Sequence, residues 1–160
     1  LIDRLLQGNS VAVVSEAGTP GISDPGYYMV RLALANDIPV IPLPGACSII
    51  ASLVASGLPT DRFIFEGFLP RKAGKRRQRL KELADEPRTI ILFESPHRLV
   101  RMLKEIRVVL GNRECATARE MTKKFEEWRR GRLEDVIQYY ENRVTRGEFV
   151  ILLKGIKSDS

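Results

Sequence analysis

A glycine-rich loop that directly follows a short apolar run is the feature that most constrains this chain. Residues 11–26 read VAVVSEAGTPGISDPG, in which Val11–Val14 predict a buried strand and the glycines and prolines predict a turn before a helix near Tyr27. In α/β proteins such a loop holds small ligands, because glycine lets the backbone approach a ligand with no Cβ in the way. The loop contains neither GxGxxG nor GxxxxGK[ST], so it is not a dinucleotide or P-loop fingerprint. The loop therefore either binds a different kind of ligand or is simply a tight turn between a strand and a helix.

The composition is typical of an ordinary globular protein, with 44% hydrophobic and 29% charged residues. The 160 residues suffice for one good core or two small domains. No apolar run approaches the roughly 18 residues that a membrane helix needs. Cys47 and Cys115 lie far apart and the chain has one histidine, so we expect no structural zinc site. Free cysteines and no visible export signal predict a cytoplasmic location.

Apolar strands alternating with helices predict an α/β fold with parallel strand pairing in the first part of the chain. There we expect helices at 1–6, 25–36 and 46–56 and strands at 11–15 and 38–43. The second part reads as α+β with a mixed sheet, from strands at 62–68, 88–93, 114–119, 125–130 and 149–153 and helices at 75–84, 95–110 and 133–141. A boundary near 57–61 predicts domains at 1–59 and 60–156, followed by a tail at 157–160.

Two parallel strands form a poor independent sheet. The chain also opens at Leu1, within a predicted helix and without a methionine. We therefore expect further strands of the first domain upstream of Leu1, so that this domain is incomplete at its N-terminus.

A second loop, PLPGACS at 42–48, follows the second predicted parallel strand. Gly45 makes the turn, and Cys47 and Ser48 open a helix whose N-terminal amides can bind a carboxylate or another polar group. Loops that follow neighbouring parallel strands meet at the same edge of the sheet, so the two loops together predict a ligand crevice. Cys47 is also read as a small packed hydrophobe.

A third loop, FESPHR at 93–98, carries two groups suited to acid or base chemistry. Ser95 and Pro96 are explained by helix initiation, as N-cap and first helical residue. Glu94 ends an apolar strand, where a carboxylate is costly unless it is paired, and His97 is the one histidine. Both are candidates for general acid or base catalysis. The alternative is an ion pair between Glu94 and Arg98, with His97 as a surface residue.

The excess of positive charge, +6 overall, is local. Seven cations and no acid occupy residues 71–81, namely Arg71, Lys72, Lys75, Arg76, Arg77, Arg79 and Lys81. The same stretch predicts an amphipathic helix with Leu80, Leu83 and Ala84 inward. The run is therefore either a solvated helix face or a surface for a polyanion. Because no acid occurs before Glu82, pairing within the helix cannot balance it, which favours an anionic partner.

A polar cluster after the strand at 114–119 is left open between two interpretations. It contains Arg119, Glu120, Thr122, Lys123 and Lys124, with Trp128 following. It is either a surface hairpin or a polar wall that contacts ligand or RNA.

In order along the chain, the motifs SEAGTPGISDPG, PLPGACS, SGLPTDRFIFEGFLPRK, ESPHR and AREMTKKFEEWRRG resemble the ribosomal-RNA small-subunit methyltransferase I family. The resemblance covers nearly the whole chain. It implies the tetrapyrrole methylase fold, two α/β domains with a cofactor cleft between them. The family's upstream PTPIGN-like and EDTR-like motifs do not occur here. Glu16 stands where aspartate is common, Met121 replaces a usual leucine, and PGACS departs modestly from PGPSA.

The resemblance implies an enzyme that uses S-adenosylmethionine to methylate the ribose 2′-oxygen of a cytidine in small-subunit ribosomal RNA. This cofactor has no phosphate, which agrees with the missing phosphate fingerprint. The implied cofactor-binding residues are Gly18, Thr19, Pro20, Ile22, Gly45, Cys47, Ser48, Phe93, Gly147 and Glu148. Candidate bases are Glu94, His97 and Glu120, and the candidate RNA-binding residues are Arg71, Lys72, Lys75, Arg76, Arg77 and Arg79.

The resemblance further implies the small ribosomal subunit as partner and a homodimer. The alternatives are a methylase of a tetrapyrrole or another small metabolite, and a non-catalytic RNA-binding fragment. The basic run argues against a compact substrate, because such a substrate needs no extended cationic strip.

Overall fold

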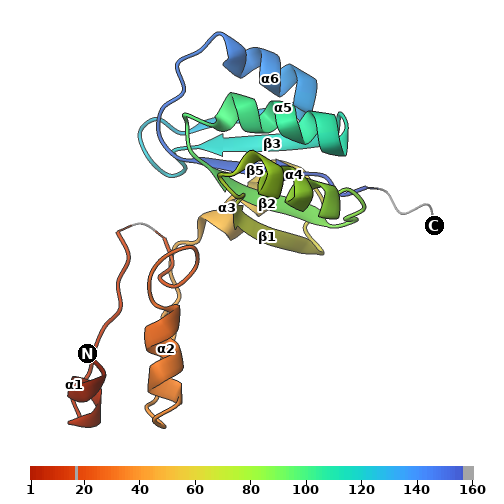
Figure 1. The fold of residues 1–160 in the computed structure, drawn as a ribbon. Coiled ribbons are helices and arrows are strands. Elements are labelled where there is room, and N and C mark those ends of the chain that lie inside the picture. Colours follow the sequence, from red (N-terminus) through yellow and green to blue (C-terminus); the bar gives the residue numbers. More distant parts are fainter. Residues whose placement is uncertain (17, 157–160) are drawn as a thin grey trace. The chain divides into compact units, whose positions relative to one another are not determined.

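The structure, a computed structural model, describes residues 1–16 and 18–156. The chain divides into two compact units, Leu1–Cys47 and the chain from Ser48 onward (Figure 1).

Among its described residues, the first unit contains two short helices, with irregular backbone on the described stretches between them. These are α1, Ile2–Leu6, and α2, Tyr27–Leu34. The turn at Gly26, which has a φ of 145°, precedes α2, so this helix starts two residues later than the sequence predicts. In the described part of the unit Ala33 is buried on α2, while Tyr27 and Tyr28 are exposed.

The strands predicted at 11–15 and 38–43 are wrong for this structure, because both segments lack any ladder partner among the described residues. Their apolar side chains stay exposed: Val14 and Leu43 are each 84% exposed and Ile41 is 78% exposed. A strand exists only through hydrogen bonds to a neighbour, and a parallel pair without further strands or covering helices is not stable. The apolar pattern therefore lacks the sheet that would bury it.

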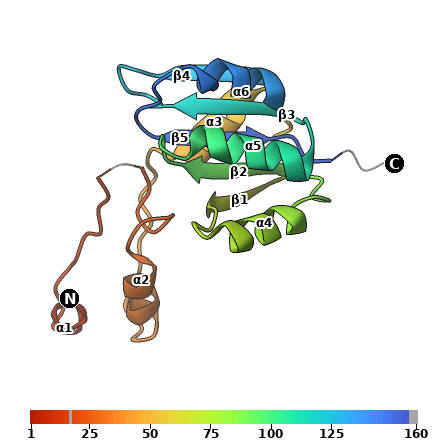
Figure 2. The same cartoon turned by 45° about the horizontal axis from the view of Figure 1, so that its top comes forward.

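The second unit is built on one mixed five-stranded sheet in the order β1-β2-β5-β3-β4 (Figures 1 and 2). Its strands are β1 Phe63–Phe68, β2 Thr89–Glu94, β3 Glu114–Arg119, β4 Glu127–Arg132 and β5 Phe149–Leu153. β1 and β2 are parallel, whereas β5 is antiparallel to β2 and β3, and β4 is antiparallel to β3. The predicted mixed sheet is confirmed, and β4 lies two residues further along the chain than predicted.

Helices cover both faces of this sheet (Figure 2). They are α3 Ser48–Ser56, α4 Ala73–Glu82, α5 Leu99–Leu110 and α6 Leu133–Glu141. α4, α5 and α6 share one core with alternate residues of the strands, including Ile90, Leu92, Ile151 and Leu153. α3 packs on β3 and β5 from the other face. The domain boundary near residue 59 stays a prediction, while in this structure α3 packs with the second unit.

Ser95–Arg98 form a turn rather than the first turn of a helix. The amide of Arg98 donates to the Ser95 carbonyl at 3.1 Å, and α5 begins at Leu99 with Arg98 as its N-cap. The predicted N-cap role of Ser95 is therefore wrong. The turn holds residues 95–98 next to the end of β2.

The strand register brings several chain ends to one edge of the sheet. Glu94 at the end of β2 pairs with Phe149 at the start of β5, which also pairs with Arg119 at the end of β3. Arg119 in turn pairs with Glu127 at the start of β4. We call this the carboxyl edge, because β1, β2 and β3 all end there. It gathers the loops that follow Phe68, Glu94 and Arg119.

Candidate functional site

The two glycine-containing loops of the first unit lie against each other. The Thr19 hydroxyl donates to the Ala46 carbonyl at 3.0 Å, and a Cβ at Gly18 would lie 3.9 Å from the same oxygen. Gly18 has a φ of +79°, a conformation that L side chains rarely adopt. The structure thus brings Gly18 and Thr19 next to Ala46, while the ligand crevice stays a prediction.

These loops present backbone and small side chains. Gly18 and Gly45 are exposed, Pro20 and Cys47 are half-buried, and Ile22 is 46% exposed. Backbone with no Cβ at Gly18 and Gly45 leaves room for a carboxylate or a polar ligand edge, so these residues fit a small ligand.

Ser48, the remaining cofactor candidate of PLPGACS, is the first residue of α3 in the second unit.

At the carboxyl edge, Glu94 is 2% exposed. One carboxylate oxygen accepts a hydrogen bond from the Ser95 amide at 2.8 Å, and the other lies 3.3 Å from Arg98 without a hydrogen bond. The predicted Glu94–Arg98 pair is confirmed. Burial raises the pKa of Glu94, while the Ser95 amide and the charges of Arg98 and Arg76 oppose the rise. A raised pKa makes the Glu94 carboxylate a stronger base than an ordinary carboxylate.

The other two candidates near the end of β2 are Phe93, within the strand, and His97, in the turn that follows. The Phe93 ring meets Phe65 and Phe68 edge-on, with centroids 4.9 and 5.7 Å apart. His97 is exposed in the turn, which is joined to the 142–148 segment by a hydrogen bond from the Thr145 hydroxyl to the Pro96 carbonyl at 2.8 Å. Phe93 and His97 therefore lie on neighbouring stretches of chain at this edge.

Glu120, Gly147 and Glu148, which the sequence suggests separately, form one cluster. The Glu120 carboxylate accepts the Glu148 amide at 2.9 Å and Lys123 at 3.2 Å, and Lys123 also pairs with Glu148 at 3.0 Å. Gly147 has a φ of +83°, and a Cβ there would lie 2.5 Å from the Glu120 side chain, so any other residue would be strained and would displace Glu120. The Glu148 amide and Lys123 lower the pKa of Glu120, which makes its carboxylate a weaker base.

The polar cluster after β3 lies in a surface hairpin, since β3 and β4 are antiparallel neighbours. Its loop is constrained: Glu120 and Thr122 have positive φ values of 46° and 63°. Glu126 accepts the Thr122 amide at 2.6 Å and the Trp128 indole at 2.9 Å. The hairpin interpretation is confirmed, and the hairpin still borders the carboxyl edge.

The structure removes Arg76 from the side chains available to RNA. Its side chain is 4% exposed and forms a bidentate pair with Glu105 of α5 at 2.6 and 2.7 Å. Arg76 lies on the buried face of α4, one turn before Leu80 and two before Leu83. The hydrogen bonds from Arg76 lower the pKa of Glu105 to about 2.

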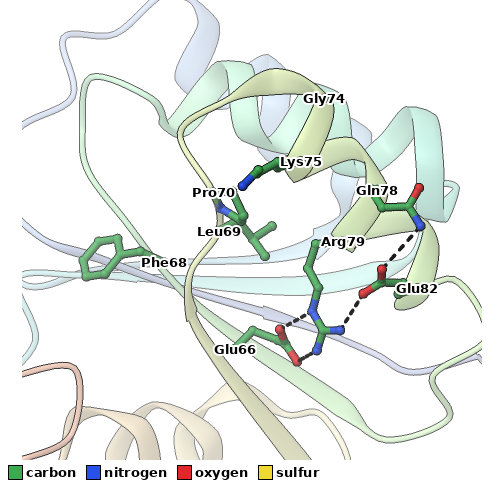
Figure 3. Close-up of a pocket in the computed structure, with 9 residues that line it drawn as sticks. All are labelled: Glu66, Phe68, Leu69, Pro70, Gly74, Lys75, Gln78, Arg79 and Glu82. Atoms are coloured by element: carbon green, nitrogen blue, oxygen red, sulfur yellow. Dashed lines mark hydrogen bonds and ion pairs between the residues drawn. The ribbon is translucent and has the colours of Figure 1, made fainter.

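Arg79 is also engaged, by two carboxylates (Figure 3). It forms a bidentate pair with Glu66 of β1 at 2.7 and 2.8 Å, and a further bond to Glu82 at 2.7 Å. These hydrogen bonds raise the pKa of Arg79, and the bonds to Glu66 contribute more than the bond to Glu82. The network lines a shallow hollow of about 510 Å³ between the end of β1 and α4, bordered by Phe68 and Leu69.

In the described structure, the remaining cations of the basic run have no acidic partner. Within the described part of the chain, five exposed side chains of this run form no ion pair: Arg71, Lys72, Lys75, Arg77 and Lys81. We call these five residues the basic surface. Unneutralised, neighbouring cations create a positive potential that attracts polyanions.

Sequence reasoning missed the acids that neutralise Arg76 and Arg79. Glu105 and Glu66 lie 29 and 13 residues away along the chain, so no local pattern points to them. The sequence did indicate that Arg76 is buried, because Arg76, Leu80 and Leu83 follow the i, i+4, i+7 spacing of one helix face.

Cys115 is buried on β3, and burial raises the pKa of its thiol to about 12. This thiol is inert at neutral pH.

None of the helices in the described residues is long and apolar enough to cross a membrane.

The fold is that of a methylase: the chain belongs to the family of tetrapyrrole (corrin/porphyrin) methylases, whose family model matches residues 1–137. Within it, the chain is 50% identical over 157 residues to ribosomal RNA small subunit methyltransferase I of Pseudomonas aeruginosa, covering 96% of this chain and 56% of the relative. The protein of the same name from Halalkalibacterium halodurans is 46% identical, with coverages of 97% and 54%. The resemblance inferred from the motifs is confirmed. The chain spans about half the length of these relatives.

Solved structures agree on the fold. The methyltransferase CobJ matches with a TM-score of 0.69 at 20% identity, covering 96% of this chain and 68% of CobJ. Uroporphyrin-III C-methyl transferase from Thermus thermophilus, complexed with S-adenyl homocysteine, matches with a TM-score of 0.54 at 27% identity, with coverages of 84% and 62%. The expected tetrapyrrole-methylase fold class is therefore confirmed, although the two strands expected in the first unit do not form.

Proposed function

We propose that this chain is part of an S-adenosylmethionine-dependent methyltransferase that acts on the ribose 2′-oxygen of a cytidine in small-subunit ribosomal RNA. The observation that carries the proposal is the identity of 41–50% with proteins named ribosomal RNA small subunit methyltransferase I. The basic surface supports an RNA substrate, since five unpaired cations on and before one helix suit a phosphate backbone.

The first unit supplies residues suited to the amino-acid portion of the cofactor. Gly18, Thr19, Pro20 and Ile22 approach that portion in this proposal, and Gly45 and Cys47 contribute backbone from the adjoining loop. Ser48, at the start of α3, contributes a further backbone contact. The solved relative that carries S-adenyl homocysteine supports a cofactor of this class.

The carboxyl edge supplies the remaining cofactor contacts. Phe93 lines the pocket, and Gly147 and Glu148 lie near the adenine. The Gly147 backbone is held by its fit against Glu120, and the Glu148 carboxylate is held by Lys123. These contacts fix the loop before a ligand arrives, which lowers the cost of binding.

When bound, S-adenosylmethionine supplies a methyl group on a positively charged sulfur. The residues of this chain would orient the ribose hydroxyl as the methyl acceptor, and one of them would take the hydroxyl proton as a general base. Glu94, His97 and Glu120 are the candidates at the carboxyl edge. The raised pKa of Glu94 favours it over Glu120, whose pKa is lowered.

A small-molecule methylase is the second candidate, because the solved neighbours include a uroporphyrin-III methyltransferase. Transfer of labelled methyl groups by the full-length protein separates the two functions. We expect label in small-subunit particles and none in a free tetrapyrrole. Label in the tetrapyrrole alone would overturn the RNA proposal, and no transfer to either would overturn both functions.

The proposal extends to assembly and location. It places the protein in the cytoplasm, as a homodimer that acts on the small ribosomal subunit. Sedimentation of the full-length protein, alone and with small-subunit particles, tests both interactions.

A further inference from the structure

The turn between β1 and α4, Leu69–Arg71, has three successive carbonyl groups bound by two arginines. Arg98 donates to the Leu69 carbonyl at 3.2 Å. Arg76 donates to the carbonyls of Pro70 and Arg71 at 3.1 and 2.7 Å. Loop carbonyls usually face water. Here guanidinium groups replace the water, so this turn is held from within the protein.

Both arginines are themselves anchored to other elements. Arg76 is tied to Glu105 of α5 by its bidentate pair, and Arg98 lies 3.3 Å from the buried carboxylate of Glu94 at the end of β2. The side chains of Arg76 and Arg98 are 4% and 26% exposed. The turn is therefore fixed to α5 and to the carboxyl edge through two fork-shaped groups of defined geometry.

The turn leads directly into the basic surface. Arg71 belongs to the turn, and Lys72 is the N-cap of α4. The first turn of α4 contains no acid, although helix N-termini favour negative charge and disfavour cations. Cations held at this position gain stabilisation when an anion binds, because the helix end and the side chains then attract the same group.

We infer that Arg76 and Arg98 are positioning residues that hold Leu69–Arg71 so that Arg71 and Lys72 meet RNA phosphates. The inference rests on the proposed RNA substrate. Arg76 does not touch RNA; it fixes the backbone that carries the cations which do. Without the fork the turn is no longer held, so Arg71 and Lys72 no longer meet the phosphates; affinity and salt slope both fall although the variant keeps its charge.

Conservative variants of the full-length protein test this role. Arg76→Lys and Arg98→Lys keep the positive charge and lose the fork. Binding to small-subunit particles is measured over a range of salt concentrations, with S-adenosylmethionine binding measured by calorimetry in parallel. We expect each variant to weaken particle binding by roughly 10-fold and to lower the salt slope by about one to two, while cofactor affinity stays unchanged. Arg71→Gln with Lys72→Gln gives the reference loss for the contacts themselves.

Arg113 offers a matched control. It also donates to three backbone carbonyls, those of Leu110, Lys154 and Ala84, but away from the Leu69–Arg71 turn. Arg113→Lys should lower the melting temperature while leaving the salt slope unchanged.

The outcomes separate the two proposals. If Arg71→Gln with Lys72→Gln leaves particle binding intact, the proposed RNA contact fails and the inference falls with it. If that variant binds weakly but Arg76→Lys and Arg98→Lys bind like the wild type, or no worse than Arg113→Lys, the inference alone is overturned.

Discussion

Replacing Glu105 by glutamine tests whether the Arg76–Glu105 pair is a structural element of the second unit. The change removes the carboxylate that binds Arg76 and leaves a guanidinium only 4% exposed without its counter-charge. A pKa of about 2 for Glu105, against an ordinary 4.5, corresponds to about 3 kcal/mol favouring its charged form. Because the Glu105 side chain is 21% exposed, solvent screens part of this.

We therefore expect Glu105→Gln to lower the free energy of unfolding by about 2 to 3 kcal/mol, somewhat below the loss for fully buried pairs. In a unit of this size the melting temperature should fall by about 8 to 12 °C. Thermal denaturation followed by circular dichroism measures this. Glu141→Gln is the matched control, since Glu141 pairs with Lys104 on the surface with side chains 38% and 54% exposed. Glu141→Gln should lower the free energy of unfolding by less than about 1 kcal/mol.

The pH dependence of the same experiment has a defined sign. Arg76 lowers the pKa of Glu105, so the stabilisation is present above about pH 4.5 and is lost as the pH falls towards 2. The difference in stability between wild type and Glu105→Gln should be full at pH 6 to 7 and shrink below about pH 4. A difference that does not change with pH, or one no larger than that of Glu141→Gln, would refute the reasoning.

Three further predictions concern single residues. Gly147→Ala places a methyl group 2.5 Å from Glu120 and should weaken S-adenosylmethionine binding by roughly tenfold; unchanged calorimetric affinity would contradict the proposed role of this loop. Burial raises the pKa of Glu94, so the rate should fall on the acidic side at a pH above the ordinary carboxylate range, and Glu94→Gln should abolish this limb of the pH–rate profile; an intact limb would exclude Glu94 as the base. Leu80→Ala opens a cavity at a fully buried site, and urea denaturation should show a loss of about 2 to 5 kcal/mol; a smaller loss would mean that the core closes around the gap.

Local patterns predicted the second unit well. β3, α6 and β5 have the bounds that the sequence indicates, because their apolar residues meet a core formed by the same unit. The segments 11–15 and 38–43 have equally apolar sequences but no neighbouring strand among the described residues. A pattern of apolar residues indicates which side chains a sheet would bury, while hydrogen-bonding partners decide whether a strand forms.

The acidic partners of Arg76 and Arg79 could not be predicted, because they lie far away along the sequence. The absence of acids between residues 71 and 81 indicated an unbalanced charge, yet Glu66 and Glu105 reach Arg79 and Arg76 from other elements. The charge left unbalanced is that of the basic surface. Arg76 and Arg79 are thus paired with acids, and the RNA contact at the basic surface stays a proposal.

The candidate site was predicted in separate pieces, and only the structure relates them within each unit. The Thr19–Ala46 hydrogen bond joins two loops that the sequence places at one sheet edge. The Glu120–Gly147–Glu148 cluster depends on the pairing of β3 with β5, which no local pattern reveals.

In the proposed function, the glycine loops set the affinity for the cofactor and the basic surface sets the affinity for RNA. Steady-state methyl transfer by the full-length protein measures both affinities. Two variants are compared: Gly18→Val in the first glycine loop, and a variant with Arg71, Lys72, Lys75 and Arg77 all changed to glutamine. We predict that Gly18→Val raises KM for S-adenosylmethionine with KM for small-subunit particles unchanged, and that the glutamine variant does the reverse. If both variants shift the same KM, or neither variant shifts either KM, the assignment of the two surfaces is contradicted.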